Sequence, residues 1–297
     1  MESIINQLVD NVIEITPIGH HDLKRHLVYR IKTEKQDYVI KFYYVKNRFE
    51  SEVKALQLLK NSQVPVPEVI KYGVIEGHEY IMYRYEDGIT LDKVIHQIDS
   101  RNLVALYKQA GVYLKMIHAI GQNEAFGRLA VQSYNSHKEA MDFDISRIYH
   151  HLERHEHPDE IIISRGKQVL EYEKKKMSIP IKGLCHLDYG SRNILVKKVN
   201  NSYEIVKIID FEQATITDIK RDLVYVYQKF TKNEQDLRSF SKGYGEDILR
   251  HVHSVEARIY HLHYGLSICS WSLPVDKKHY QEGISILKEY IDDRSIK

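Results

Sequence analysis

Residues 181–213 read IKGLCHLDYGSRNILVKKVNNSYEIVKIIDFEQ, and this stretch decides the fold. An apolar run leads into a polar turn that carries Asp188, and Asn193 follows five positions later, just before an alternating segment. A turn at residues 200–202 reverses the chain, and a second alternating segment ends at Asp210. The pattern predicts a β-hairpin that brings Asn193 close to Asp210 and holds Asp188 at the loop tip.

Oxygen-bearing side chains in this arrangement suit phosphoryl transfer. The reaction needs a carboxylate that orients the attacking hydroxyl and accepts its proton, and Asp188 is the candidate. It also needs hard oxygen ligands for Mg²⁺ on the nucleotide phosphates, and Mg²⁺ keeps several waters and takes only one or two protein oxygens. Asn193 and Asp210 are therefore the candidate metal ligands. The structural alternative is a hairpin whose polar residues only form turns.

The same residues resemble a known family of small-molecule kinases. Three strings carry the resemblance: His186-Leu187-Asp188, Asn193-Ile194-Leu195 and Ile209-Asp210-Phe211. They are similar to the catalytic loop and metal-binding segment of the aminoglycoside phosphotransferase and choline kinase superfamily, where H-x-D-x-x-x-x-N precedes I-D-F or I-D-W. The resemblance implies a bilobal, protein-kinase-like α+β fold. It also implies ATP- and Mg²⁺-dependent transfer of the γ-phosphoryl group to a hydroxyl.

The N-terminal part of the chain predicts an antiparallel sheet and one helix. Alternating segments span residues 13–18, 27–32, 38–44, 69–75 and 78–85, and apolar spacing predicts a helix over 48–60. Lys41 lies inside the third strand, where a charge needs a partner or a ligand. Glu52 faces inward by its spacing to Leu56 and Leu59, with Glu50 as the alternative. By the resemblance, Lys41 grips the α and β phosphates and Glu52 holds the lysine.

Two further nucleotide-binding segments follow from the resemblance. Arg84, Tyr85 and Glu86 occupy the link between the lobes, whose backbone hydrogen-bonds the adenine edge in the family. A loop of small residues is expected between the first two strands, but residues 19–26 read GHHDLKRH with one glycine. Either the basic side chains of this loop contact phosphate, or the loop lies away from the nucleotide.

The rest of the chain has helical periodicity. Helices are predicted over residues 101–118 with Ser100 as N-cap, and over 234–250, 254–270 and 277–296. Asp222 lies in a D-x-x-x-D-L stretch that resembles the family segment bracing the catalytic loop. We therefore expect a nucleotide-binding lobe over residues 1–87 and a larger, mainly helical catalytic and substrate-binding lobe over 88–297.

Residues 137–176 fall where family members insert substrate-binding helices. This segment is charged and rich in histidine. Its candidate residues for holding a cationic substrate are Asp142, Asp144, Glu153, Asp159 and Glu160. His151 and His155 are one helical turn apart, as in a zinc site, but no third ligand is evident and a solvated helix is the favoured interpretation.

Composition narrows the remaining functional classes. The 297 residues contain 43 Lys and Arg against 41 Asp and Glu, a balance that gives no reason to expect nucleic acid or membrane partners. The two cysteines cannot form a disulfide framework, and neither a signal peptide nor a membrane-spanning apolar stretch is evident, so a cytoplasmic location is expected. The 43% hydrophobic content predicts an ordinary globular core.

Three interpretations of function are carried forward. The first is a kinase for an aminoglycoside or a similar compound with amino and hydroxyl groups, which implies antibiotic resistance. The second is a choline or ethanolamine kinase, since Glu212 follows the metal segment as it often does there. The third is a non-catalytic structural protein, similar to the spore-coat relatives of the family.

Overall fold

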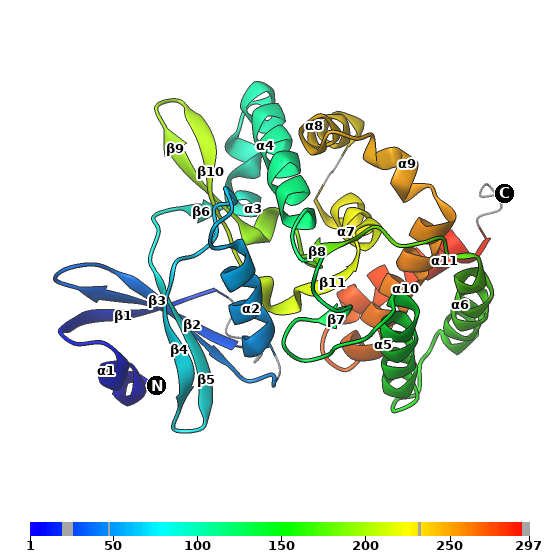
Figure 1. The fold of residues 1–297 in the computed structure, drawn as a ribbon, viewed down its shortest axis with the longest axis horizontal. Helices are drawn as coiled ribbons and strands as arrows, with labels where there is room; N and C mark the ends of the chain where they lie inside the picture. The colour runs from blue at the N-terminus through cyan, green and yellow to red at the C-terminus, as the bar shows by residue number, and fades with distance from the viewer. Residues whose placement is uncertain (20–25, 47, 231–232, 293–297) are drawn as a thin grey trace.

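The computed structural model describes residues 1–19, 26–46, 48–230 and 233–292 (Figure 1). Its N-terminal part is a five-stranded antiparallel sheet of order β1-β2-β3-β5-β4. The strands are β1 (Val12–Ile18), β2 (His26–Thr33), β3 (Tyr38–Tyr43), β4 (Val69–Ile75) and β5 (His78–Arg84). The helices of this part are α1 (Glu2–Leu8) and α2 (Phe49–Leu59).

The alternation of β3 decides which side of the sheet holds the site. Ile40 and Phe42 are fully buried with the apolar residues of α1. Successive side chains of a strand point to opposite faces, so Lys41 and Tyr43 face α2 and the second lobe. One buried charge can therefore occupy the middle of the sheet without entering its apolar core.

The C-terminal part is mainly helical and carries two small sheets, of order β10-β9-β6 and β7-β11-β8. Its helices are α3 (Leu91–Val94), α4 (Ser100–His118), α5 (His137–Leu152), α6 (Glu160–Glu173), α7 (Lys220–Lys229), α8 (Glu234–Tyr244), α9 (Ile248–Val252), α10 (Val255–Ser272) and α11 (Lys277–Asp292). Its strands are β6 (Ile89–Thr90), β7 (Gly127–Arg128), β8 (Lys182–Cys185), β9 (Ile194–Val199), β10 (Ser202–Ile208) and β11 (Thr215–Asp218). The expected bilobal, kinase-like α+β fold is confirmed.

The decisive stretch forms the hairpin that its alternation predicts. β9 and β10 pair antiparallel, with Val199 opposite Ser202 at the turn and Ile194 opposite Ile208 at the other end. The amide of Ile209 also donates to the carbonyl of Asn193 over 2.9 Å. This bond ties the catalytic loop to the residue just before Asp210.

Two expectations about the helices need correction. Asp99, rather than Ser100, caps α4, because its carboxylate accepts from the amides of residues 101 and 102. The helix expected over 234–250 is two helices, since Gly245 has a left-handed φ of 84° and ends α8 before Asp247 caps α9. The charged segment 137–176 contains the helices α5 and α6.

One of the apolar clusters spans both lobes. A single buried cluster runs from α2 and β5 through α4 to the catalytic hairpin and α8. The chain crosses between the lobes at residues 85–88, after β5 and before β6. We propose the expected boundary at residue 87 on this basis. No helix in the described part of the chain combines the length and apolar character needed to cross a bilayer.

Candidate active site

A cavity of about 1340 Å³ lies where the two lobes meet. Its wall includes side chains from β3, α2, the catalytic loop and the end of the hairpin, which lie far apart in the sequence. All eight candidate site residues line it: Lys41, Glu52, Arg84, Tyr85, Glu86, Asp188, Asn193 and Asp210.

Lys41 is the centre of the nucleotide-facing half. Its Nζ lies 2.9 Å from Glu52 Oε2 and 2.6 Å from Asp210 Oδ1, although Asp210 is 169 positions away in the chain. Burial alone would lower the pKa of Lys41, but the surrounding carboxylates outweigh it and raise that pKa well above its ordinary value. The lysine is therefore charged. Of the two glutamates considered for α2, Glu52 makes this contact and Glu50 is exposed.

Two tyrosines that the sequence analysis did not predict hold Glu52 in place. Tyr43 and Tyr83 both donate their hydroxyls to its carboxylate, the second over 2.8 Å. Both lie on neighbouring strands of the sheet, one on β3 and the other on β5. Strand alternation places them on the same face as Lys41, which is the signal that would have identified them.

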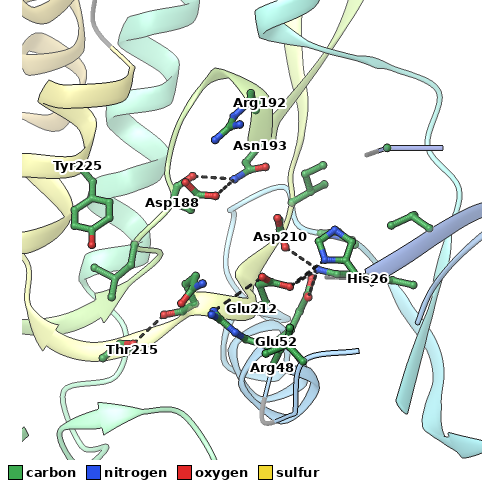
Figure 2. A pocket seen from close by; sticks show the side chains of 18 of the residues that line it. His26, Arg48, Glu52, Asp188, Arg192, Asn193, Asp210, Glu212, Thr215 and Tyr225 are labelled. Atoms are coloured by element: carbon green, nitrogen blue, oxygen red, sulfur yellow. Dashed lines mark hydrogen bonds and ion pairs between the residues drawn. The ribbon is translucent and has the colours of Figure 1, made fainter. Parts of the chain in front are cut away.

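Glu212 is a third carboxylate on the lysine. Its Oε2 lies 3.2 Å from Lys41 Nζ and 3.5 Å from His26 Nδ1, and Figure 2 shows it beside Glu52 and Asp210. Burial raises the pKa of Asp210, and the nearby Glu212 and Glu52 add to the increase against Lys41. The backbone of Asp210 has a left-handed φ of 69°, a strained conformation of the kind found at functional sites.

Asp188 and Asn193 form the second group, on the catalytic loop (Figure 2). Asn193 Nδ2 donates to the backbone oxygen of Asp188 over 2.9 Å and to its Oδ2 over 3.0 Å. The other carboxylate oxygen, Oδ1, lies 2.9 Å from Lys229 Nζ on α7. Burial disfavours the charge of Asp188, but Lys229 outweighs it and lowers the pKa below its ordinary value. The sequence analysis did not predict a role for Lys229.

Buried polar groups hold the catalytic loop in shape. His186 Nε2 lies 3.0 Å from the carbonyl of Ile209, and its Nδ1 lies 3.3 Å from the amide of Asp188. Asp222 accepts from the amides of His186 and Leu187 over 2.6 and 2.7 Å. Asp222 therefore braces the backbone of the loop from beneath.

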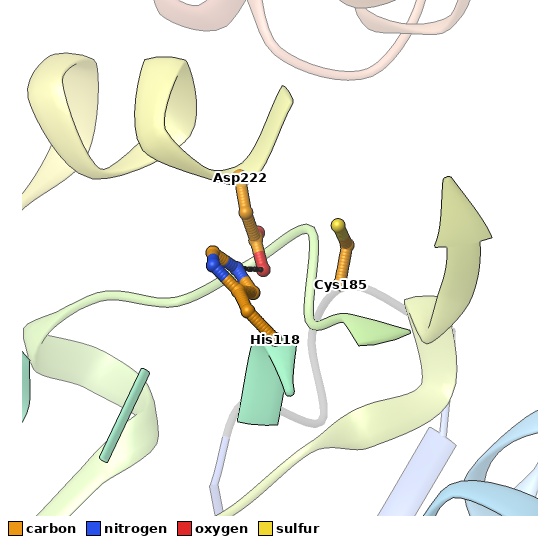
Figure 3. Close-up of side chains that lie close together, drawn as sticks. All are labelled: His118, Cys185 and Asp222. Atoms are coloured by element: carbon orange, nitrogen blue, oxygen red, sulfur yellow. Dashed lines mark hydrogen bonds and ion pairs between the residues drawn. The ribbon is translucent and has the colours of Figure 1, made fainter. Parts of the chain in front are cut away.

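His118 and Cys185 lie beside Asp222, and all three are buried (Figure 3). His118 Nδ1 lies 2.7 Å from the hydroxyl of Tyr244, and its Nε2 lies 3.2 Å from Asp222. Burial raises the pKa of Cys185 well above its ordinary value, so the thiol is protonated and unreactive. These contacts support the catalytic loop from below.

The link between the lobes lines the cavity through Arg84, Tyr85 and Glu86. The amide of Arg84 donates to Glu68 and that of Tyr85 donates to Asp37, each over 3.0 Å. Among the described residues, the amide of Glu86 makes no such hydrogen bond, so we propose Glu86 as the residue of the link that contacts a nucleotide base. Of the loop at 19–26, only Gly19 and His26 belong to the described residues, so its phosphate role lies outside them.

The acidic candidates of the inserted helices do not gather at the cavity. Only Asp144 of the five lines it. Asp142 pairs with Lys138 and Lys174, and Glu153 lies 3.8 Å from Lys167. Within the described part of the chain, two groups of side chains are close enough together to hold a metal ion: His118 with Cys185 and Asp222, and Glu52 with Asp210 and Glu212. Neither group includes His151 or His155.

This fold, with a lysine, a glutamate and two aspartates at the junction of its lobes, defines a kinase-like small-molecule phosphotransferase. A family model supports that class: the phosphotransferase enzyme family (APH) matches residues 16–256. The chain belongs to this family and is a phosphotransferase. No curated protein sequence matched.

Several solved structures have the same fold. One is a thermostable mutant of aminoglycoside phosphotransferase APH(4)-Ia with ADP and hygromycin B; it has a TM-score of 0.79 at 17% identity, covering 98% of this chain and 97% of that one. Aminoglycoside 2'-phosphotransferase-IIIa with GDP gives 0.72 at 16%, covering 98% and 97%. Spectinomycin phosphotransferase APH(9)-Ia with ADP and spectinomycin gives 0.60 at 18%, covering 97% and 93%.

Proposed function

We propose that the protein transfers the γ-phosphoryl group of ATP, with Mg²⁺, to a hydroxyl of a small molecule. The observation that carries this proposal is the meeting of Lys41, Glu52 and Asp210 on one cavity with Asp188 and Asn193. The complexes of ADP and GDP with structural relatives support a nucleotide in this cavity. A non-catalytic protein has no need for a buried lysine held by several carboxylates.

The donor atoms near the hairpin suit Mg²⁺. Asn193 uses its Nδ2 on Asp188, which leaves its amide oxygen for a metal, and the half-buried carboxylate of Asp210 lines the same cavity. When bound there, Mg²⁺ would offset the negative charge that develops on the phosphates. Asn193 and Asp210 would hold it from two sides of the hairpin.

The side chains of this protein then have separate tasks. Lys41 would position the phosphates, and Glu52 would hold Lys41. Asp188 would orient the acceptor hydroxyl and take its proton while the hydroxyl oxygen bonds to the γ-phosphorus. The bond from that phosphorus to the β–γ bridging oxygen breaks, and the nucleotide leaves as the diphosphate. Positioning and charge stabilisation carry most of the rate in such a reaction, so the depressed pKa of Asp188 is compatible with its role.

The test is Asp188→Asn in an ATP-consumption assay against aminoglycosides, choline, ethanolamine and sugar alcohols. We expect the variant to lose at least about three orders of magnitude in kcat, because the amide cannot accept the proton. Its stabilisation by Mg-ATP should persist, since a ligand at a hundred times its Kd adds about 2.7 kcal/mol whether or not it reacts. Normal turnover in the variant, or no stabilisation of the unaltered protein by Mg-ATP, contradicts the proposal.

A further inference from the structure

The wall of the cavity beyond Asp188 carries several basic side chains. Three residues of α7 face it, Arg221, Tyr225 and Lys229. They are four positions apart, so they form one stripe along the helix, about 12 Å from end to end. Lys229 contacts Asp188 at one end of the stripe, and Arg221 lies at the other end. Basic and aromatic side chains therefore extend away from the reacting position.

Three arginines meet at the far end of this wall. Arg147 comes from α5, Arg221 from α7 and Arg128 from β7. Asp144 Oδ1 lies 2.8 Å from Arg147, and its Oδ2 lies 2.7 Å from Arg221 and 3.1 Å from His263. One carboxylate thus serves two arginines and a histidine.

The third arginine forms no salt bridge with a carboxylate among the described residues. Arg128 donates to the neutral amide of Gln213 over 2.8 Å. Burial lowers the pKa of Arg128 to about 10, the positive charges of Arg48 and Arg147 add to the decrease, and the carboxylates of Asp144 and Glu212 oppose it only in part. Bringing these cations together costs free energy that an anion would recover.

A buried donor also lacks a partner here. The Nε of Arg221 is buried and makes no hydrogen bond within the described structure, although Arg221 is only 8% exposed and lines the cavity. An unpaired buried donor is destabilising, so a ligand that accepts a hydrogen bond from it is favoured. Guanidinium groups match carboxylate and phosphate oxygens in shape as well as charge.

We propose that Arg128, Arg147 and Arg221 form an anion-binding subsite for the acceptor, which carries a carboxylate or phosphate group besides its reacting hydroxyl. The proposal rests on the phosphotransferase function above and narrows it. The anionic group would bind the arginines, and the hydroxyl would reach Asp188 along the stripe of α7. Tyr225, Tyr264 and Trp271 also line this part of the cavity and would pack against the carbon frame. A polycationic aminoglycoside would instead meet like charges.

The test compares ligands that differ mainly in charge. Glucose, glucosamine, gluconate, glucose 6-phosphate and inorganic phosphate are added at equal ionic strength to protein saturated with Mg-ADP, and the Tm is measured. Inorganic phosphate reports the subsite without any sugar frame. Gluconate and glucose 6-phosphate separate a preference for carboxylate from one for phosphate. We expect stabilisation by the anions and none by glucosamine.

Two variants on α5 locate the effect. Arg147→Gln removes a half-exposed arginine of the subsite and should weaken anion binding about tenfold or more, as expected for a charge-assisted hydrogen bond. Lys138→Gln removes an equal charge from the same helix at an exposed position outside the cavity and should leave anion binding unchanged. Using Arg147 avoids the risk that loss of the buried Arg221 unfolds the protein.

The outcomes separate the two proposals. Stabilisation by Mg-ADP alone supports the nucleotide site whichever acceptor is preferred. Stabilisation by glucosamine rather than the anions, no response to any anion, or an equal loss in Arg147→Gln and Lys138→Gln overturns the anion subsite while leaving phosphotransfer intact. If Mg-ADP itself fails to stabilise the protein, the proposed function fails and the subsite fails with it.

Discussion

Replacing Lys229 by Met tests how the catalytic loop sets the charge of Asp188. The lysine Nζ lies 2.9 Å from Asp188 Oδ1, and the two side chains are 30% and 28% exposed. A hydrogen bond between charged groups contributes about 1.5–3 kcal/mol, and partial exposure favours the lower end. A loss of about 1.4 kcal/mol in transition-state stabilisation corresponds to a tenfold fall in kcat/KM. We expect a fall of about that size at neutral pH.

The pH dependence gives the sharper readout. Lys229 lowers the pKa of Asp188, so the carboxylate stays ionised to a lower pH than usual. Stability from this depressed pKa is present above the unfolded pKa and is lost as pH falls through the folded one. Without Lys229 the folded pKa rises, and the acidic limb of the kcat/KM profile should move to higher pH.

The control is Lys229→Arg, which keeps the positive charge. Its acidic limb should lie nearer that of the unaltered protein than the limb of Lys229→Met does. The KM for ATP should change little in either variant. Lys229, on α7, contacts Asp188 and does not contact Lys41 or its carboxylate partners Glu52 and Asp210. An acidic limb that stays in place in Lys229→Met, or moves to lower pH, refutes this reasoning.

Three further substitutions test the supports around the site. Glu52→Gln should raise the KM for ATP about tenfold by loosening Lys41, while Glu50→Gln on the exposed face of α2 should not. Asp222→Asn should lower the free energy of unfolding by about 1–3 kcal/mol and reduce kcat, since one of two buried loop amides loses its acceptor. Gly243→Ala should lower the Tm with kcat unchanged, because the added Cβ would lie 1.8 Å from the carbonyl oxygen of Lys108 on α4. The control is Lys242→Ala at an exposed position, whose Tm should stay close to that of the unaltered protein.

The sequence predicted the parts of the site that lie within one hairpin or one strand and helix. Asp188, Asn193 and Asp210 belong to a single supersecondary unit, so spacing and turn residues suffice to place them. Lys41 stands out because a charge inside a strand requires a partner. Glu52 was preferred to Glu50 because of its position on the helix face, and in the structure Glu52 contacts Lys41.

The parts that escaped prediction depend on packing between distant elements. Lys229 lies 41 positions after Asp188 on a helix with no unusual pattern, so nothing local indicates their contact. The acids of residues 137–176 were interpreted as a cationic substrate site, yet only Asp144 of the five lines the cavity, and Asp142 and Glu153 pair with lysines away from it. Net charge along a segment does not reveal which side chains face inward. The packing of both α5 and α7 against α10 brings Asp144 to Arg221.

The cavity is divided by charge, and this division accounts for both proposals. In the nucleotide half, Glu52, Asp210 and Glu212 share Lys41, with Arg48 and His26 also beside Glu212, and these carboxylates would favour the proposed Mg²⁺. In the acceptor half, three arginines surround Asp144, which would favour an anionic group. Mg²⁺ and the anionic group of the acceptor would therefore bind in different halves of the cavity. Asp188 lies between the two halves, where the hydroxyl of one ligand would meet the phosphate of the other.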